Sequence, residues 1–459
     1  MPVDSHLSDS ETRPSPLSAD VGSFGIWALA WPTMASMGAG TVVRFTDFAM
    51  VGSLGPAALA GVGLGGQFTW LLEAVGAIAP AGLAAILARA VGRQDWKLAN
   101  ASFRQAQLLG AFLSLIGCAL LIPFTTQLMS VFGVEPDVVR YGSDYLWWRI
   151  WGSLPLSAAI VFGTALRAAG DVRTPLWVSA GAAVVNVFLN WVLIYGNLGS
   201  PALGVVGAAV ASNLAIALMV VIFVWLWSRR ALAIRPDAGS WKPDPSLFRR
   251  LARIGTPAGI EGGMFQVGLL VFQRIMSPFG TEAIAAYHVG ATILSFSFIP
   301  GVGFSTAAAT LVGQRLGAGL PDVASSDGWR SNLGCVLAMS GFGLILILGA
   351  RPIAGIFTKD PTVLELAIDV IWILGAAHPF MAVEFALGGA LRGAGDTVFP
   401  MVTVFAGLLC IRLGLSFVLA TLFDASIQVF WCALIADYFV KSLMFIGRFR
   451  SGVWKRVVV

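Results

Sequence analysis

Three polar residues stand out because they interrupt long apolar stretches. Asp47 lies in VVRFTDFAMVG (42–52), and Asn186 and Asn190 lie four residues apart in VVNVFLNWVL (184–193). If the second stretch is a helix, that spacing puts both amides on one face. A carboxylate can exchange a proton or bind a cation, whereas an amide can coordinate a cation but cannot titrate. Asp47, Asn186 and Asn190 are therefore candidates for a polar functional site.

Each of these residues also has a purely structural explanation. Asp47 could form an ion pair with Arg44, which lies three residues earlier on the same helix face. The two asparagines could hydrogen-bond neighbouring helices. An unpaired carboxylate inside an apolar helix is costly, however, and by default marks a functional site.

Other charged and aromatic side chains within apolar stretches are candidates for a substrate cavity. A buried carboxylate can relay protons, balance a cationic substrate, or form a buried pair with Arg274 or Arg412. Asp437 and Lys441 are four residues apart, so we expect them to pair with each other. Tryptophans near the middle of a helix can stack on flat cations, although most tryptophans in membrane proteins face lipid or the membrane–water interface. The cavity candidates are Glu73, Glu261, Glu384, Trp147 and Trp151.

The composition indicates an integral membrane protein. Of 459 residues, 57% are hydrophobic and 12% are charged, whereas a soluble domain has about 25% charged residues. The net charge of +5 fits basic cytoplasmic loops and not nucleic-acid binding. Four isolated cysteines, three scattered histidines and no GxxxxGK[ST] motif predict neither an enzyme, nor a metal site, nor a cofactor.

The elements that carry these residues occur twice. ALRAAGDVRTP (165–175) returns as ALRGAGDTVFP (390–400), an offset of 392 − 167 = 225 residues. At this offset Asp47, Asn186 and Asn190 fall on Phe272, Ile411 and Leu415, so they break the symmetry. A single-copy polar residue is a better functional candidate than a duplicated one, which serves the same structural purpose in both halves.

The duplicated residues therefore receive structural predictions. Arg167 with Asp171, and Arg392 with Asp396, are four apart and are expected to pair locally as loop locks, with a cytoplasmic gate as the alternative. Pro32 and Pro257 lie in the first apolar stretch of each half, where proline removes a hydrogen bond and permits helix bending.

The hydropathy pattern predicts twelve membrane spans, six in each half. Twenty Lys and Arg fall in the predicted cytoplasmic loops and C-terminal tail against three in the outer loops, so both termini are expected inside. The two halves then form a parallel repeat, as in alternating-access transporters. We predict a disordered cytoplasmic tail (1–22), an N-lobe (23–229), a cytoplasmic linker (230–250), a C-lobe (251–449) and a basic cytoplasmic tail (450–459). The predicted spans are 23–51, 57–86, 101–124, 140–165, 174–196, 204–229, 251–277, 283–313, 329–350, 365–391, 398–421 and 426–449.

The doubled LRxAGDxxxP motif, together with GTPAGIEGGMFQVGLLVF (255–272), AAYHVG and TLVGQRLGAG, resembles the multidrug and toxin extrusion (MATE) transporters, most of all the bacterial DinF-like branch. The resemblance implies a V-shaped pair of six-helix lobes in the bacterial inner membrane. It implies export of cationic or amphiphilic organic compounds in exchange for protons or sodium ions, with no obligate protein partner. Asp47 matches the family's first-helix Asp, which is tied to cation binding or proton exchange, so the resemblance implies that Asp47, Asn186 and Asn190 serve cation or proton coupling. Asn190 stands where many members have a second carboxylate.

One alternative within the same architecture is a flippase for lipid-linked oligosaccharides or lipids. Such a protein is expected to have a strongly cationic cavity. Only four arginines within the apolar stretches could provide one: Arg44, Arg149, Arg274 and Arg412.

Overall fold

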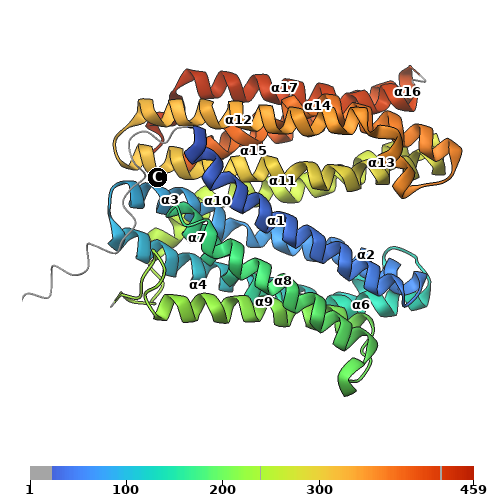
Figure 1. Cartoon of the computed structure of the whole chain (residues 1–459), viewed down its shortest axis with the longest axis horizontal. Helices are drawn as coiled ribbons and strands as arrows, with labels where there is room; N and C mark the ends of the chain where they lie inside the picture. Colours follow the sequence, from blue (N-terminus) through green and yellow to red (C-terminus); the bar gives the residue numbers. More distant parts are fainter. Residues whose placement is uncertain (1–22, 238, 424–425) are drawn as a thin grey trace, which may run out of the picture.

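The computed structural model describes residues 23–237, 239–423 and 426–459, and the predicted tail 1–22 lies outside them. The described chain forms two helical lobes, one blue to green and one yellow to red in Figure 1. The N-lobe contains α1 (Ser23–Gly52), α2 (Pro56–Gly76), α3 (Ile78–Gly92), α4 (Trp96–Leu121), α5 (Thr125–Ser130), α6 (Pro136–Trp151), α7 (Ser153–Ala168), α8 (Arg173–Tyr195) and α9 (Val205–Ser228).

The C-lobe repeats this order with fewer breaks. It contains α10 (Pro245–Met276), α11 (Thr281–Gly317), α12 (Pro321–Leu348), α13 (Ala350–Phe357), α14 (Pro361–Gly393), α15 (Val398–Ala406), α16 (Gly414–Leu422) and α17 (Ile427–Ser451). A π-helical segment, η4 (Gly407–Leu413), joins α15 to α16, and short 3₁₀ turns include η3 (Ser277–Phe279) and η5 (Val453–Arg456). The prediction of an all-helical, two-lobed membrane protein is confirmed.

Within the described residues, nine helical segments are long and apolar enough to cross a membrane. A tenth is the pair α6 and α7, which bends by 48° at Gly152. Helices α1 and α10 are not among them, because glycines, prolines and charged side chains lower their hydropathy. The predicted total of twelve spans therefore stays a prediction, although each predicted range falls on a helix of the structure.

The linker between the lobes is shorter than predicted. Helix α10 begins at Pro245 and not at 251, because Asp244 caps it by accepting from the backbone N–H groups of Ser246 and Leu247. Proline suits the first helical position, since it has no N–H to leave unpaired. Hydrogen bonds from the Ser246 side chain and from these backbone groups hold the pKa of Asp244 below its usual range.

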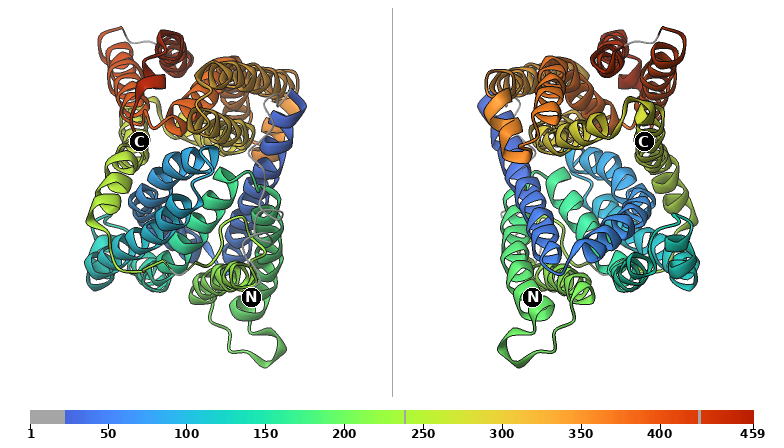
Figure 2. Two further views of the ribbon diagram at one scale, coloured as in Figure 1. Left: turned by 90° about the vertical axis from the view of Figure 1, so that its left-hand side faces the viewer. Right: turned by 90° about the vertical axis from the view of Figure 1, so that its right-hand side faces the viewer.

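The two lobes meet through the first helices of each half. Helix α1 packs against α11 as well as α8, and α10 packs against α3 as well as α15. The closest contacts are glycine to backbone: a side chain at Gly92 would overlap the Gln314 carbonyl, and one at Gly255 would overlap the Ile78 carbonyl. This end of the molecule, with the C-terminus, holds the lobes together, and Figure 2 shows the chain end between them. Toward the opposite end the ribbons of α2 and α13 diverge (Figure 1).

The C-terminal residues 452–459 contribute to this closed end. Trp454 is wholly buried and stacks on Phe449, with ring centroids 4.6 Å apart. Arg89 of α3 donates to the Val457 carbonyl (2.8 Å) and to the Ala394 carbonyl (2.7 Å), so one N-lobe side chain ties two parts of the C-terminal half.

The predicted loop locks are wrong in their partners. Arg392 pairs with Glu261 (2.6 Å) and Asp396 with Arg448 (2.8 Å), while Asp171 accepts from the backbone N–H of Thr174 (3.0 Å). The reason is the glycine between each predicted pair: Gly170 (φ +94°) and Gly395 (φ +85°) are left-handed and end the helix. The four-residue spacing therefore no longer places Arg and Asp on one helix face.

Candidate functional site

The residues predicted to couple a cation lie together in the N-lobe. Asn190 on α8 donates to the Asp47 carboxylate on α1, and it also donates to the side-chain oxygen of Asn186, Oδ1 (3.1 Å). Asn186 in turn donates to Ser212 Oγ on α9 (3.2 Å), and Ser212 donates to the second Asp47 oxygen (3.4 Å). The four side chains form a closed ring, which we call the Asp47 ring.

Helix packing explains why the ring forms. Helix α8 packs against both α1 and α9, so residues spaced by one turn on α8 face both neighbours at once. Asn190 is fully buried and Asn186 nearly so. Asn190 Oδ1 has no hydrogen-bond partner among the described residues. A buried, unsatisfied oxygen beside a carboxylate is suited to ligate a cation, because hard cations prefer oxygen ligands.

Arg44 and Asp47 do not form the ion pair that was the structural explanation for Asp47. The Arg44 guanidinium lies over the Trp70 ring instead, 6.0 Å from its centroid. Asp47 thus has amide and hydroxyl partners and no cationic side chain in direct contact among the described residues.

The N-lobe carboxylate Glu73 lies outside the Asp47 ring. Arg149 Nη2 lies 3.7 Å from Glu73 Oε1, and Arg149 also donates to Asn213 Oδ1 (3.3 Å). Glu73 is therefore half of an ion pair, but with Arg149 and not with Arg274 or Arg412, the partners suggested for it.

The C-lobe carboxylates are paired as well, but not as suggested. Glu384 pairs with Lys441 (2.7 Å), and Glu261 pairs with Arg392, rather than with Arg274 or Arg412. Asp437 lies 3.4 Å from Lys441, as expected, and 2.5 Å from Arg412. Arg412, Asp437 and Lys441 are all at most 2% exposed, so this is a buried charge network between α14, η4 and α17.

Comparisons with known proteins show the family to which the chain belongs. The MatE family model matches twice, over residues 32–192 and 257–418, and the two matches begin 257 − 32 = 225 residues apart, the offset of the internal repeat. The chain belongs to the MATE family. Its members include the "Probable multidrug resistance protein NorM" of Thermotoga maritima, 32% identical over 94% of this chain and 93% of the relative. Another NorM protein, from Mesorhizobium japonicum, is 27% identical over 92% of each chain.

Solved structures share the fold. A MOP superfamily transporter from Pyrococcus furiosus superimposes with a TM-score of 0.89 over 97% of this chain and 98% of that one, at 19% identity. A multidrug resistance MATE family transporter solved in an outward-facing conformation gives a TM-score of 0.88 with the same coverage and identity. The family model and the NorM relatives, which match most of the chain, show that this MATE protein is a membrane transporter and not an enzyme. Its place in the DinF-like branch stays a prediction.

Sequence reasoning did not select Ser212. The internal repeat of this MATE protein could have identified it, because Ser212 corresponds to Asp437 at the 225-residue offset. A hydroxyl in one half and a carboxylate in the other mark a position where both lobes keep a polar group for different purposes.

The two predicted cavity tryptophans are surface residues. Trp147 and Trp151 are 37% and 50% exposed, and they contact each other edge to face. Neither lines the two cavities described next. Their exposure suits contact with lipid, the alternative considered for them.

An aromatic cavity of about 180 Å³, called the C-lobe cavity below, lies between α10, α11, α14 and α17. Trp70 of α2 reaches it from the N-lobe, and Arg412 also lines it. The aromatic C-lobe residues around it are Phe265, Phe272, Tyr287, Phe298 and Trp431.

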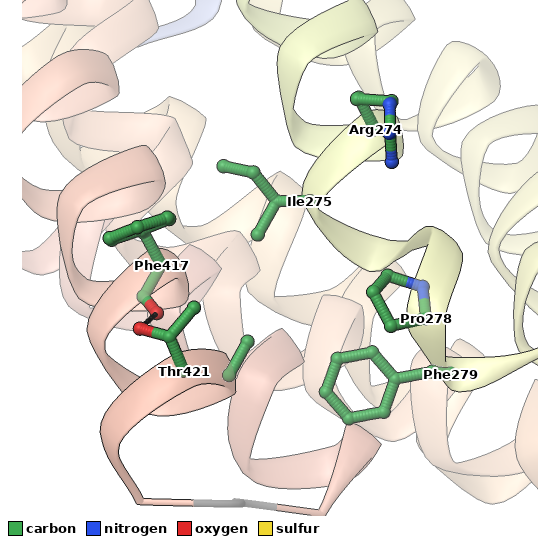
Figure 3. Close-up of a pocket in the computed structure, with 7 residues that line it drawn as sticks. Arg274, Ile275, Pro278, Phe279, Phe417 and Thr421 are labelled. Carbon is green, nitrogen blue, oxygen red and sulfur yellow. Dashed lines mark hydrogen bonds between the residues drawn. The ribbon is translucent and has the colours of Figure 1, made fainter.

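A second cavity, of about 480 Å³, lies between the end of α10 and α16. Arg274, Pro278 and Phe279 face Phe417 and Thr421 across it (Figure 3). Arg274 already donates to Ser277 Oγ (2.8 Å). We assign no substrate role to this cavity.

Proposed function

We propose that this MATE protein is a secondary active antiporter that exports cationic or amphiphilic organic compounds in exchange for protons or sodium ions. The Asp47 ring carries the proposal: a carboxylate, two amides and a hydroxyl converge from three helices inside the N-lobe. The names of the NorM relatives support multidrug export. The charge distribution of the loops supports a bacterial inner-membrane protein with both termini in the cytoplasm.

The ring suits alternation between two occupancies of one site. With a proton on Asp47 or a cation among the ring oxygens, the buried negative charge is neutralised and the helices can close around it. Loss of the proton or cation leaves the carboxylate with only amide and hydroxyl partners, which do not cancel its charge. Exchange at this site can thus bias the rocking of α1, which packs against both lobes.

The alternative of a lipid or lipid-linked oligosaccharide flippase calls for a strongly cationic cavity. Two of the four candidate arginines, Arg149 and Arg412, are instead held by carboxylates. Arg412 is the one charged residue that lines the aromatic cavity within the described chain, so that cavity is not the strongly cationic one that a flippase would need.

Ethidium efflux from proteoliposomes tests the proposal and identifies the ion. Efflux driven by an imposed pH gradient, with no response to sodium, supports proton exchange. Efflux driven by a sodium gradient at constant pH supports sodium exchange through the ring oxygens. Ethidium retained under both gradients, in protein that is shown to be folded, contradicts the antiporter proposal.

A further inference from the structure

The C-lobe cavity has the size and walls of a site for an aromatic ring. Its volume of about 180 Å³ is slightly larger than the roughly 150 Å³ apolar cavity that accommodates benzene in an engineered protein. Phe265 and Phe298 contact each other at 6.3 Å and Phe272 and Tyr287 at 5.6 Å between centroids, so aromatic faces and edges already line two sides. Such walls favour an aromatic guest in offset or edge-to-face geometry.

The polarity of the cavity is set by Arg412. It is the one charged residue among those that line the cavity within the described chain. Its side chain is almost completely buried, and its Nε has no hydrogen-bond partner in the described structure. Nη2 contacts Asp437, and Lys441 lies 3.4 Å from the same carboxylate oxygen. Lys441 also pairs with Glu384 (2.7 Å), so two cations meet two carboxylates in this network, and the Arg412 guanidinium keeps its Nε–H as a spare donor.

The internal repeat shows that this polarity is opposite to that of the N-lobe. Phe272 in the cavity corresponds to Asp47 (272 − 225 = 47), and Arg412 corresponds to Val187 (412 − 225 = 187), next to Asn186. Equivalent positions in the two lobes therefore offer a carboxylate with amides in one and an arginine with aromatic walls in the other.

We propose that the C-lobe cavity binds an aromatic carboxylate, with the ring between the aromatic walls and Arg412 Nε–H donating to a carboxylate oxygen. Arginine is the side chain best suited to this pairing, because its guanidinium presents several fixed donors to a carboxylate. An aromatic cation would place its charge beside Arg412 with no carboxylate lining the cavity to balance it. Arg44, stacked on Trp70 at the N-lobe side, adds a second positive charge near the cavity.

The inference rests on the proposed transport function, since it makes the cavity a substrate subsite, but binding can be measured without transport. We would follow 4-fluorobenzoate and 4-fluorobenzylammonium, a matched anion and cation, by ¹⁹F NMR with the purified full chain in detergent. The acid is expected to bind at least about tenfold more tightly than the ammonium compound, a difference of about 1.4 kcal/mol.

Two variants locate the site. Arg412→Gln should weaken binding of the acid at least about tenfold and should leave binding of the cation unchanged or tighter, because it removes the charge that opposes the cation. Because that change strips a partner from Asp437 and can unfold the protein, Leu294→Trp is the second variant: it fills the cavity and leaves every ion pair in place. Leu337→Trp on α12, where Leu337 is 65% exposed, is the matched control and should bind the acid normally.

The outcomes separate this inference from the antiporter proposal. Preference for the acid that is lost in Leu294→Trp and kept in Leu337→Trp supports the cavity as its site. Equal affinity for the two probes, no binding of either, or acid binding unchanged in Leu294→Trp overturns the inference. Ethidium efflux, assayed separately, then shows whether the antiporter proposal stands by itself.

Discussion

Asn190 on α8 donates a hydrogen bond from its side-chain amide to the Asp47 carboxylate on α1, across 143 residues of sequence. The same amide also donates to Asn186 and leaves its own oxygen without a partner in the described structure. Asn190 thus stabilises the Asp47 carboxylate with its N–H group and leaves its Oδ1 available as a cation ligand. Asn190 therefore links the packing of α8 on α1 to the ion affinity of the site.

Replacing Asn190 should change the affinity of the ion site without unfolding the lobe. For sodium exchange, Asn190→Ala removes the unpaired Oδ1 as a ligand, so the apparent affinity for sodium should fall about tenfold or more. For proton exchange the sign is opposite: loss of a donor to the carboxylate, an interaction of roughly 1.5–3 kcal/mol, favours the protonated form and should raise the apparent affinity for protons. The measurement is the ion concentration that gives half-maximal ethidium efflux. Asn197→Ala, at an exposed amide that bonds only the Trp191 carbonyl, is the control and should leave that concentration unchanged. An unaltered ion dependence in Asn190→Ala would contradict the role given to this amide.

The glycine contacts between the lobes should determine how closely the lobes approach each other at the end of the molecule that carries the C-terminus. Gly255→Ala puts a methyl group into the Ile78 carbonyl, and overpacking of this kind costs about 1–3 kcal/mol. We expect spin labels on α3 and α11 to show a larger distance at this end, together with slower efflux. On the same helix Gly263 has open space around it, so Gly263→Ala should change neither quantity. Matching distance distributions for the two variants would show that the glycines do not set lobe closure.

The buried charge network of the C-lobe should be important for stability. Asp437→Asn leaves Arg412 and Lys441 short of an anion, and breaking a buried pair costs about 3–5 kcal/mol. Thermal unfolding in detergent should therefore show a large fall in the midpoint. Asp322→Asn, which breaks the exposed pair with Lys455, should have almost no effect. Equal midpoints for the two variants would mean that the buried network contributes nothing net.

Sequence reasoning succeeded where a regular helix spacing or the internal repeat determines which residues lie together. The four-residue spacing of Asn186 and Asn190 put both amides on one face, and the 225-residue offset singled out Asp47 as unmatched. It failed at Arg167 and Asp171, because the left-handed glycine between them ends the helix. It also failed to find Lys441 as the partner of Glu384, since that contact depends on how α14 packs on α17, which no local pattern encodes.

The central claim is that ion exchange at Asp47 drives export. It is tested most directly by ethidium efflux from proteoliposomes containing wild-type protein, Asp47→Asn, or the control Asp137→Asn, whose carboxylate is exposed near the start of α6. Under the gradient that drives the wild type, we predict that Asp47→Asn loses gradient-driven efflux and that Asp137→Asn keeps it. Wild-type efflux from Asp47→Asn under that gradient would contradict the account and exclude Asp47 from the coupling mechanism.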